Sequence, residues 1–207
     1  MADPKNIPGN KFYHFVDKSK VKDKVRFRPK EKFPKKYLVW QAIDECGHVS
    51  EPYVKVGTMK ADEYRTECLQ KRLIPFIKKY HDIEDVLFWP DLATIHYQID
   101  VRNWMSSQNL SFVTKTANAP NVPQARPIEK YWGLSKSKFG QRSRAPKNII
   151  GFKKVWRTIS EDVAKSSAKK LMGSVRRRLR LIGDKGVFAP LKEKNLLFEK
   201  LLKFCFT

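Results

Sequence analysis

Two short hydrophobic runs near the start of the chain have the pattern of β-strands. They cover residues 37–43 and 52–56 and are rich in aromatic and β-branched residues. The turn signal Asp-Glu-Cys-Gly at 44–47 lies between them, so the pattern predicts a β-hairpin. From residue 60 to 80 apolar positions recur at intervals of three and four, which predicts an amphipathic helix. Pro75 should kink or break this helix near its last turn.

The middle of the chain alternates between strand and helix patterns. The apolar run at 85–90 is short enough for a buried strand, and residues 110–113 predict another strand. A helix is predicted over 94–107, with Ile95, Ile99 and Trp104 facing inward.

Two further helices are predicted beyond this point. One begins at Glu129, and the other runs from Ser160, as its N-cap, to Ile182, with Gly183 as its C-cap. Residues 191–207 fit either a short helix or a tail. The order of elements predicts an α/β fold in which helices pack on a mixed sheet.

Composition narrows the class of protein. The chain has 207 residues, of which 41% are hydrophobic, so a core can form and wholesale disorder is excluded. No apolar run reaches the roughly 18 residues of a membrane span, and the first residues lack the apolar segment of a signal peptide. We therefore expect a soluble, intracellular protein with no membrane partner.

Cys46 and His48 lie two residues apart, but no second ligand pair follows, so spacing does not predict a zinc site.

Positive charge is concentrated toward the end of the chain. The net charge is +22, and residues 130–207 hold 21 basic and 5 acidic side chains. Such an imbalance is typical of a protein that binds a polyanion. A cluster of arginines on a helix is either a solvated face or a set of phosphate contacts, which position DNA without reading its sequence. The candidate phosphate-binding residues are Lys136, Lys138, Arg142, Arg144, Lys147, Arg176, Arg177, Arg178 and Arg180.

Two carboxylates stand at the edges of predicted elements. Asp91 directly follows the strand at 85–90, and Glu129 opens a helix 38 positions later. This order can bring both to one end of a sheet, where oxygen ligands bind Mg²⁺ or Mn²⁺. Each also has a structural alternative: Asp91 as a cap of the following helix, and Glu129 as a first-turn acid that the helix dipole favours.

Three segments resemble the catalytic domain of mariner-type transposases, members of the DDE superfamily with a ribonuclease-H-like fold. They are Val-Trp-Gln-Ala-Ile at 39–43, Phe-Trp-Pro-Asp-Leu-Ala-Thr-Ile-His at 88–96 and Pro-Ile-Glu-Lys-Tyr-Trp at 127–132. The resemblance covers residues 12–186. It implies that Asp91 and Glu129 are catalytic Mg²⁺ ligands in two-metal DNA strand cleavage and transfer, with no small-molecule substrate. His96 would either orient a ligand or simply be packed.

The chain departs from the family at its first carboxylate. The strand that carries it, and the domains that read transposon ends, have no match in this sequence. Asp44, at the turn end of the first predicted strand, is the nearest candidate substitute. We therefore expect impaired cleavage, and an open sheet edge that lowers stability and favours self-association.

These observations divide the chain into four parts. A basic N-terminal arm (1–36) precedes a truncated ribonuclease-H-like domain (37–140), a basic helical region (141–190) and a tail (191–207). The sequence predicts a nuclear, transposase-derived DNA-binding protein with an impaired Mg²⁺-dependent activity. The alternative is a non-catalytic basic protein that binds chromatin or RNA.

Overall fold

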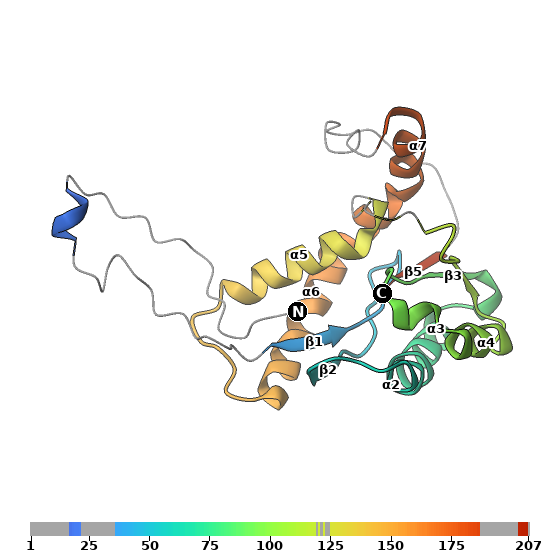
Figure 1. Cartoon of the computed structure of the whole chain (residues 1–207), viewed down its shortest axis with the longest axis horizontal. Coiled ribbons are helices and arrows are strands. Elements are labelled where there is room, and N and C mark those ends of the chain that lie inside the picture. Colours follow the sequence, from blue (N-terminus) through green and yellow to red (C-terminus); the bar gives the residue numbers. More distant parts are fainter. Residues whose placement is uncertain are drawn as a thin grey trace.

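The structure is a computed structural model that describes residues 17–21, 36–118, 120, 122 and 125–186, and the backbone of 203–206. Helices and strands alternate along it, so the predicted α/β class is confirmed (Figure 1). In chain order the elements are η1 (Lys18–Lys20), β1 (Tyr37–Trp40), β2 (Tyr53–Val56), α2 (Ala61–Glu63), the π-helix η2 (Tyr64–Leu73), α3 (Ile74–Tyr80), η3 (Ile83–Asp85), β3 (Val86–Trp89), η4 (Thr94–Tyr97), α4 (Ile99–Ser107), β4 (Ser111–Phe112), α5 (Pro127–Gly140), α6 (Ile149–Gly173), α7 (Val175–Lys185) and β5 (Lys203–Phe206).

The strands form two small sheets. β1 and β2 pair antiparallel, as the hairpin prediction required, and an isolated bridge joins Ile43 to Val49. The second sheet has the order β4-β3-β5, and both of its pairings are parallel. β3 therefore has a partner on each side. The open edge that we expected is not found on this strand, because β5 lies along it.

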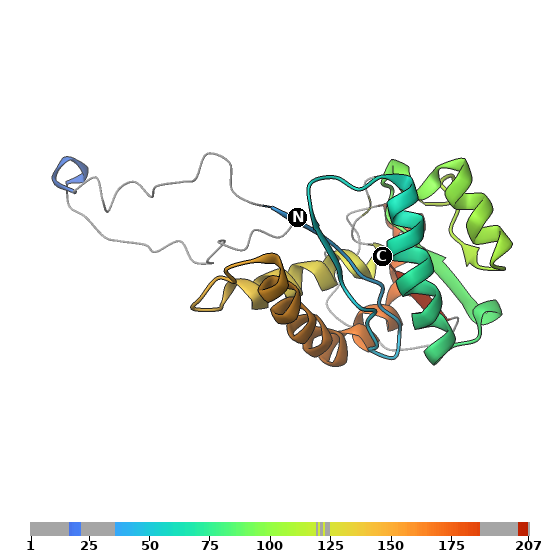
Figure 2. The same cartoon turned by 90° about the horizontal axis from the view of Figure 1, so that it is seen from below.

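Side chains of β3 alternate between two cores, as the period of a strand requires. Val86 and Phe88 pack with the helices α2 to α4, whereas Trp89 packs with α5, α6 and α7. The hairpin contributes in the same way, with Trp40 in the first core and Tyr37 in the second. The molecule thus has three layers, with strands between two groups of helices (Figures 1 and 2).

A buried glutamine ties the hairpin to α6. Gln41 is fully buried and accepts a hydrogen bond from Trp156 Nε1 at 2.8 Å. Its amide nitrogen donates to the carbonyl oxygen of Ser50 at 3.0 Å and to Ser160 Oγ at 3.1 Å. A buried amide is stable only when its polar atoms are paired, so this network fixes the hairpin against the helix.

The helix over residues 61–80 runs through Pro75, so the predicted break is not found. The ten residues before α3 form widened π-turns, and the Ile74 N–H donates to the carbonyl of Leu69, five residues back. Pro75 then falls at the start of α3, directly after these π-turns, and it has no N–H to donate to the preceding turn. The wide turns thus accommodate the proline.

The structure corrects other helix predictions as well. Helix α6 begins after Asn148, so Ser160 is a buried residue in its interior rather than an N-cap. Gly183 lies within α7, whose C-cap is Gly186 at φ 81°. Ile99 is exposed rather than inward-facing. In the predicted tail, residues 203–206 form a strand, while 191–202 and most of the arm at 1–36 lie outside the described residues.

Candidate functional site

Asp91 lies just beyond the C-terminal end of β3, in the turn before η4. Its Oδ1 accepts a hydrogen bond from the Ala93 N–H at 2.7 Å and lies 2.9 Å from His96 Nδ1. The carboxylate is 46% exposed, whereas the imidazole is only 6% exposed and packs against the ring of Tyr64. Asp91 therefore orders the turn, while a face of its carboxylate still reaches solvent.

Burial and hydrogen bonding act in opposite directions on this carboxyl group. Burial raises the pKa of Asp91, but the hydrogen bond and the positive potential of His96 lower it more. The Ala93 N–H and the nearby Arg126 guanidinium lower it further. The pKa therefore lies below its ordinary value, so Asp91 is an anion at neutral pH.

Glu129 lies in the first turn of α5, the position that its structural alternative predicts. Its carboxylate is 42% exposed, and Oε1 lies 3.6 Å from Nη2 of Arg126, the N-cap residue of the helix. The Arg126 side chain is 9% exposed, and its Nε and Nη1 atoms have no hydrogen-bond partner. The positive charge of Arg126 also lowers the pKa of Asp91, so one guanidinium acts electrostatically on both candidate carboxylates.

This arrangement does not fit a two-metal centre. Such a centre needs several oxygen ligands around two dications, but here Glu129 faces the Arg126 guanidinium and Asp91 is bonded to His96. Among the described residues, the only group of three His, Cys, Asp or Glu ligand atoms within 4.8 Å of one another is elsewhere, at Asp44, Cys46 and His48. Asp91, His96 and Glu129 do not form such a group, so we derive no metal-dependent step from them.

Asp44 does not lie with the other two carboxylates. Its Oδ2 is 2.8 Å from Nε2 of His81, a residue that precedes β3, whereas Asp91 follows that strand. The two acids thus pair with different histidines, Asp44 with His81 and Asp91 with His96. The candidate third ligand is therefore directed to a different part of the molecule.

A cavity of about 270 Å³ lies beside Arg126. Asn118, its other polar residue, is already bonded to Trp89, Pro90 and Tyr97. The remaining wall is apolar, so the cavity lacks the converging donors that a phosphate needs. It is lined by Leu87, Trp89, Val113, Ala117, Asn118, Val122, Ala125, Arg126, Leu179 and Ile182.

The second candidate site is the basic surface of α5 to α7. Residues 130–185 contain 17 basic and 3 acidic side chains. Exposed cations recur along α6 at intervals that keep them on one face, at Lys154, Lys165 and Lys169. Within the described part of the chain these three lysines form no salt bridge, so their charges are available to an anionic partner.

The predicted phosphate-binding residues divide into different environments. Lys136, Arg144 and Lys147 are exposed, and Lys138 is exposed but pairs with Asp162 at 3.0 Å. Arg142 is half-buried, with its guanidinium 5.7 Å from the Phe139 ring centre. Phosphate contact remains a prediction for all five residues.

The arginines of α7 are not equivalent either. Arg178 donates from Nη2 to the carbonyl of Leu171 at 2.8 Å, and burial lowers the pKa of its guanidinium. It satisfies a carbonyl at the end of α6. Phosphate contact by Arg178 stays a prediction. Arg176 and Arg177 are half-buried, and Arg180 is exposed.

Comparison with known proteins gives neither a matching family model nor a matching curated protein. Function is therefore argued from the residues of this chain. Sequence reasoning missed Arg126, although it directly precedes the Pro-Ile-Glu motif, and it missed His81, whose partner lies 37 positions away. None of the helices in the described ranges has the length and apolarity needed to cross a lipid bilayer.

Proposed function

We propose that this protein binds nucleic acid, and DNA in particular, through the basic surface of α5, α6 and α7. The observation that carries the proposal is the excess of 17 basic over 3 acidic side chains in residues 130–185, with exposed cations in a row along α6. Lys154 and Lys169 are 15 residues apart, which is about 22 Å along a helix. That length faces several phosphates of a DNA strand.

We further propose that the protein derives from the catalytic domain of a mariner-type transposase. Support comes from the order of the Asp91 and Glu129 segments and from their common neighbour Arg126. In this proposal β5 (Lys-Phe-Cys-Phe) stands beside β3 in the ribonuclease-H-like sheet, and it carries no acidic residue. Strand cleavage with Mg²⁺ or Mn²⁺ would be the ancestral activity, and Arg126 replaces part of the charge that an ion would supply. The site of action would be the nucleus.

Binding can be tested by fluorescence anisotropy with a labelled DNA duplex over a range of salt concentrations. We expect a triple variant, Lys154→Gln with Lys165→Gln and Lys169→Gln, to bind about 10- to 100-fold more weakly near 0.1 M salt. The slope of log K against log salt should fall by about 0.9 for each phosphate that the variant leaves unneutralised.

A matched control removes the same charge from the opposite helical layer. Lys60, Lys78 and Lys79 are exposed on or beside α2 and α3, and their triple Gln variant should bind nearly as well as the parent. Equally weakened binding in the two variants would reject a specific binding surface. Tighter binding to an RNA duplex of the same length would favour the alternative of an RNA-binding protein.

The same preparations test the loss of cleavage. We expect no Mn²⁺-dependent nicking of supercoiled plasmid above that of Asp91→Ala and Glu129→Ala variants. Nicking by the parent that disappears in both variants would show that a working metal site survives. That result would reject the proposed loss of cleavage and leave the proposed DNA binding unaffected.

A further inference from the structure

The turn between β1 and β2 is organised around one buried carboxylate. Asp44 is fully buried, and its Oδ1 accepts the backbone N–H groups of Cys46 at 2.9 Å and His48 at 2.8 Å. Gly47 adopts φ 94°, and a Cβ there would lie 3.2 Å from the carbonyl oxygen of Ala164 in α6. The turn is therefore pressed against that helix, and its conformation is fixed.

The second oxygen of the same carboxylate faces two imidazoles. Oδ2 lies 2.6 Å from His48 Nδ1 and 2.8 Å from His81 Nε2. The His48 ring is also stacked on Tyr80, with ring centres 3.8 Å apart and planes within 9° of parallel. Oδ1 alone is enough to hold the turn, so a turn-forming role does not account for the two imidazoles on Oδ2.

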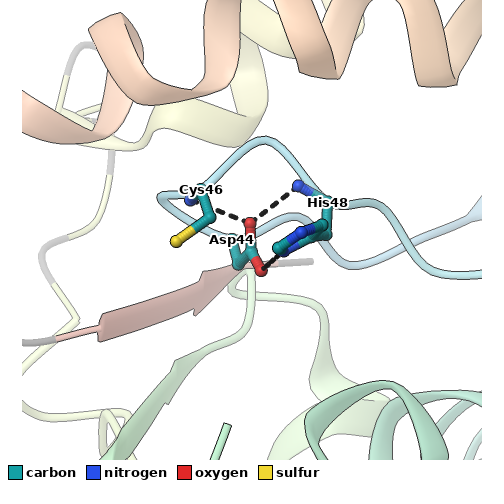
Figure 3. Close-up of side chains that lie close together, drawn as sticks. All are labelled: Asp44, Cys46 and His48. Atoms are coloured by element: carbon teal, nitrogen blue, oxygen red, sulfur yellow. Dashed lines mark hydrogen bonds and ion pairs between the residues drawn. The ribbon is translucent and has the colours of Figure 1, made fainter. Parts of the chain in front are cut away.

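Cys46 completes a set of three different ligand types. Its thiol, a carboxylate oxygen of Asp44 and a ring nitrogen of His48 all lie within 4.8 Å of one another (Figure 3). Cys46 is a reduced, exposed residue, and His48 is 39% exposed. An ion can therefore reach these atoms from solvent, while the buried Asp44 is already oriented by the turn.

We propose that Asp44, Cys46 and His48 form a binding site for a transition-metal ion such as Zn²⁺. Zinc accepts thiolate, imidazole and carboxylate ligands at about 2.0–2.3 Å in a tetrahedral arrangement, and thiolate selects it over Mg²⁺. The ion takes the place of the proton between His48 Nδ1 and Asp44 Oδ2, and the His48 ring turns so that these atoms separate from 2.6 Å to about 3.3 Å. This proton and the proton of the Cys46 thiol pass to solvent. Water fills the fourth position.

His81 acts as a positioning residue in this site. It is almost fully buried and approaches the ligand oxygen from the end of α3, the pattern of an outer-shell hydrogen bond that orients a metal ligand. A bound ion thus links the hairpin turn to α3 through Asp44 and to α6 through the packing of Gly47. The proposal does not rest on the basic surface, although the turn lies against α6 beside Lys165.

Cobalt titration of the full-length chain tests the site directly. Co²⁺ is a spectroscopic substitute for Zn²⁺, and a thiolate ligand gives a near-ultraviolet charge-transfer band. We expect the parent to show this band at one equivalent and lose it when Zn²⁺ is added. Cys46→Ser should abolish the band, and His48→Gln should weaken Co²⁺ affinity by at least about tenfold.

Cys68→Ala is the matched control. Cys68 is a buried thiol in the core that contains Val86 and Phe88, and burial raises its pKa. This variant should keep the band and the affinity of the parent. The proposal is overturned if the parent shows no thiolate band, or if Cys46→Ser binds Co²⁺ with unchanged affinity and spectrum. Zn²⁺ should also raise the thermal midpoint of the parent and not that of Cys46→Ser, a readout independent of the spectrum.

Discussion

The carboxylates of Asp91 and Glu129 are stabilised by positive charges of the protein. The Asp91 carboxylate accepts from His96 and Ala93 on one side and lies in the field of Arg126 on the other. Glu129 shares the same arginine. A buried guanidinium needs nearby anions, because an uncompensated buried charge is costly. The two acids thus have a structural role whether or not they once held metal.

The lowered pKa of Asp91 predicts a pH-dependent stability. The carboxylate is favoured in the folded state, so its contribution is present above its unfolded pKa, about 3.9, and is lost as the pH falls through the lower folded pKa. Asp91→Asn lacks this contribution. The difference in free energy of unfolding between parent and variant should therefore shrink on going from about pH 6 to about pH 3. Urea denaturation at several pH values measures it.

His96→Gln provides a companion measurement, because the hydrogen bond from His96 is the main factor that lowers this pKa. The free energy of unfolding of the His96→Gln variant should therefore depend less on pH than that of the parent, as for Asp91→Asn. A difference between parent and Asp91→Asn that stays constant over this pH range would contradict the assignment.

At the scale of elements, α6 differs most from its prediction. Ser160 followed by Glu161 and Asp162 looks like a helix start, since acids favour the first turn. The N-cap is instead Asn148, twelve residues earlier, whose Oδ1 accepts the Gly151 N–H at 2.8 Å. The part of α6 before Ser160 is helical because it buries Phe152 and Trp156 against the hairpin. Tertiary packing therefore overrides the local signal.

Asn148→Ala should lower the free energy of unfolding by about 1 kcal/mol, because it removes the acceptor of an otherwise unpaired N–H at the start of α6. Chemical denaturation followed by circular dichroism measures the change. Asn148→Ser keeps an acceptor and should restore most of the stability. If Asn148→Ala and Asn148→Ser are equally unstable, the side chain does not act as a cap.

At the scale of the whole molecule, the sheet is assembled from distant parts of the chain. β3 pairs with β4, which follows it closely, and with β5, whose Cys205 lies opposite Phe88. The second pairing covers an edge that would otherwise be open to other chains. β5 thus completes the sheet as its second edge strand and leaves β3 in the centre.

A chain ending at residue 202 tests this role of β5. Loss of the strand should lower the thermal midpoint by roughly 5 °C or more and increase self-association, since β3 would have an unpaired edge. Calorimetry and size-exclusion chromatography measure the two effects. A chain that lacks only Thr207 retains β5 and should match the parent. Equal behaviour of the two shortened chains would show that β5 does not stabilise the sheet.

The sequence by itself determined the features that depend on local pattern. The hairpin, the strand before Asp91, the helix at Glu129 and the basic second half all follow from short-range periodicity and charge. For the candidate site it placed Asp91 and Glu129 at the ends of elements, as found.

Only the tertiary structure decided what depends on contacts between distant residues. It gave Glu129 a contact with the Arg126 guanidinium and paired Asp44 and Asp91 with different histidines. It also brought His81 to Asp44 and β5 to β3. Such contacts are fixed by how the layers pack together, and periodicity along the chain does not encode which layers meet.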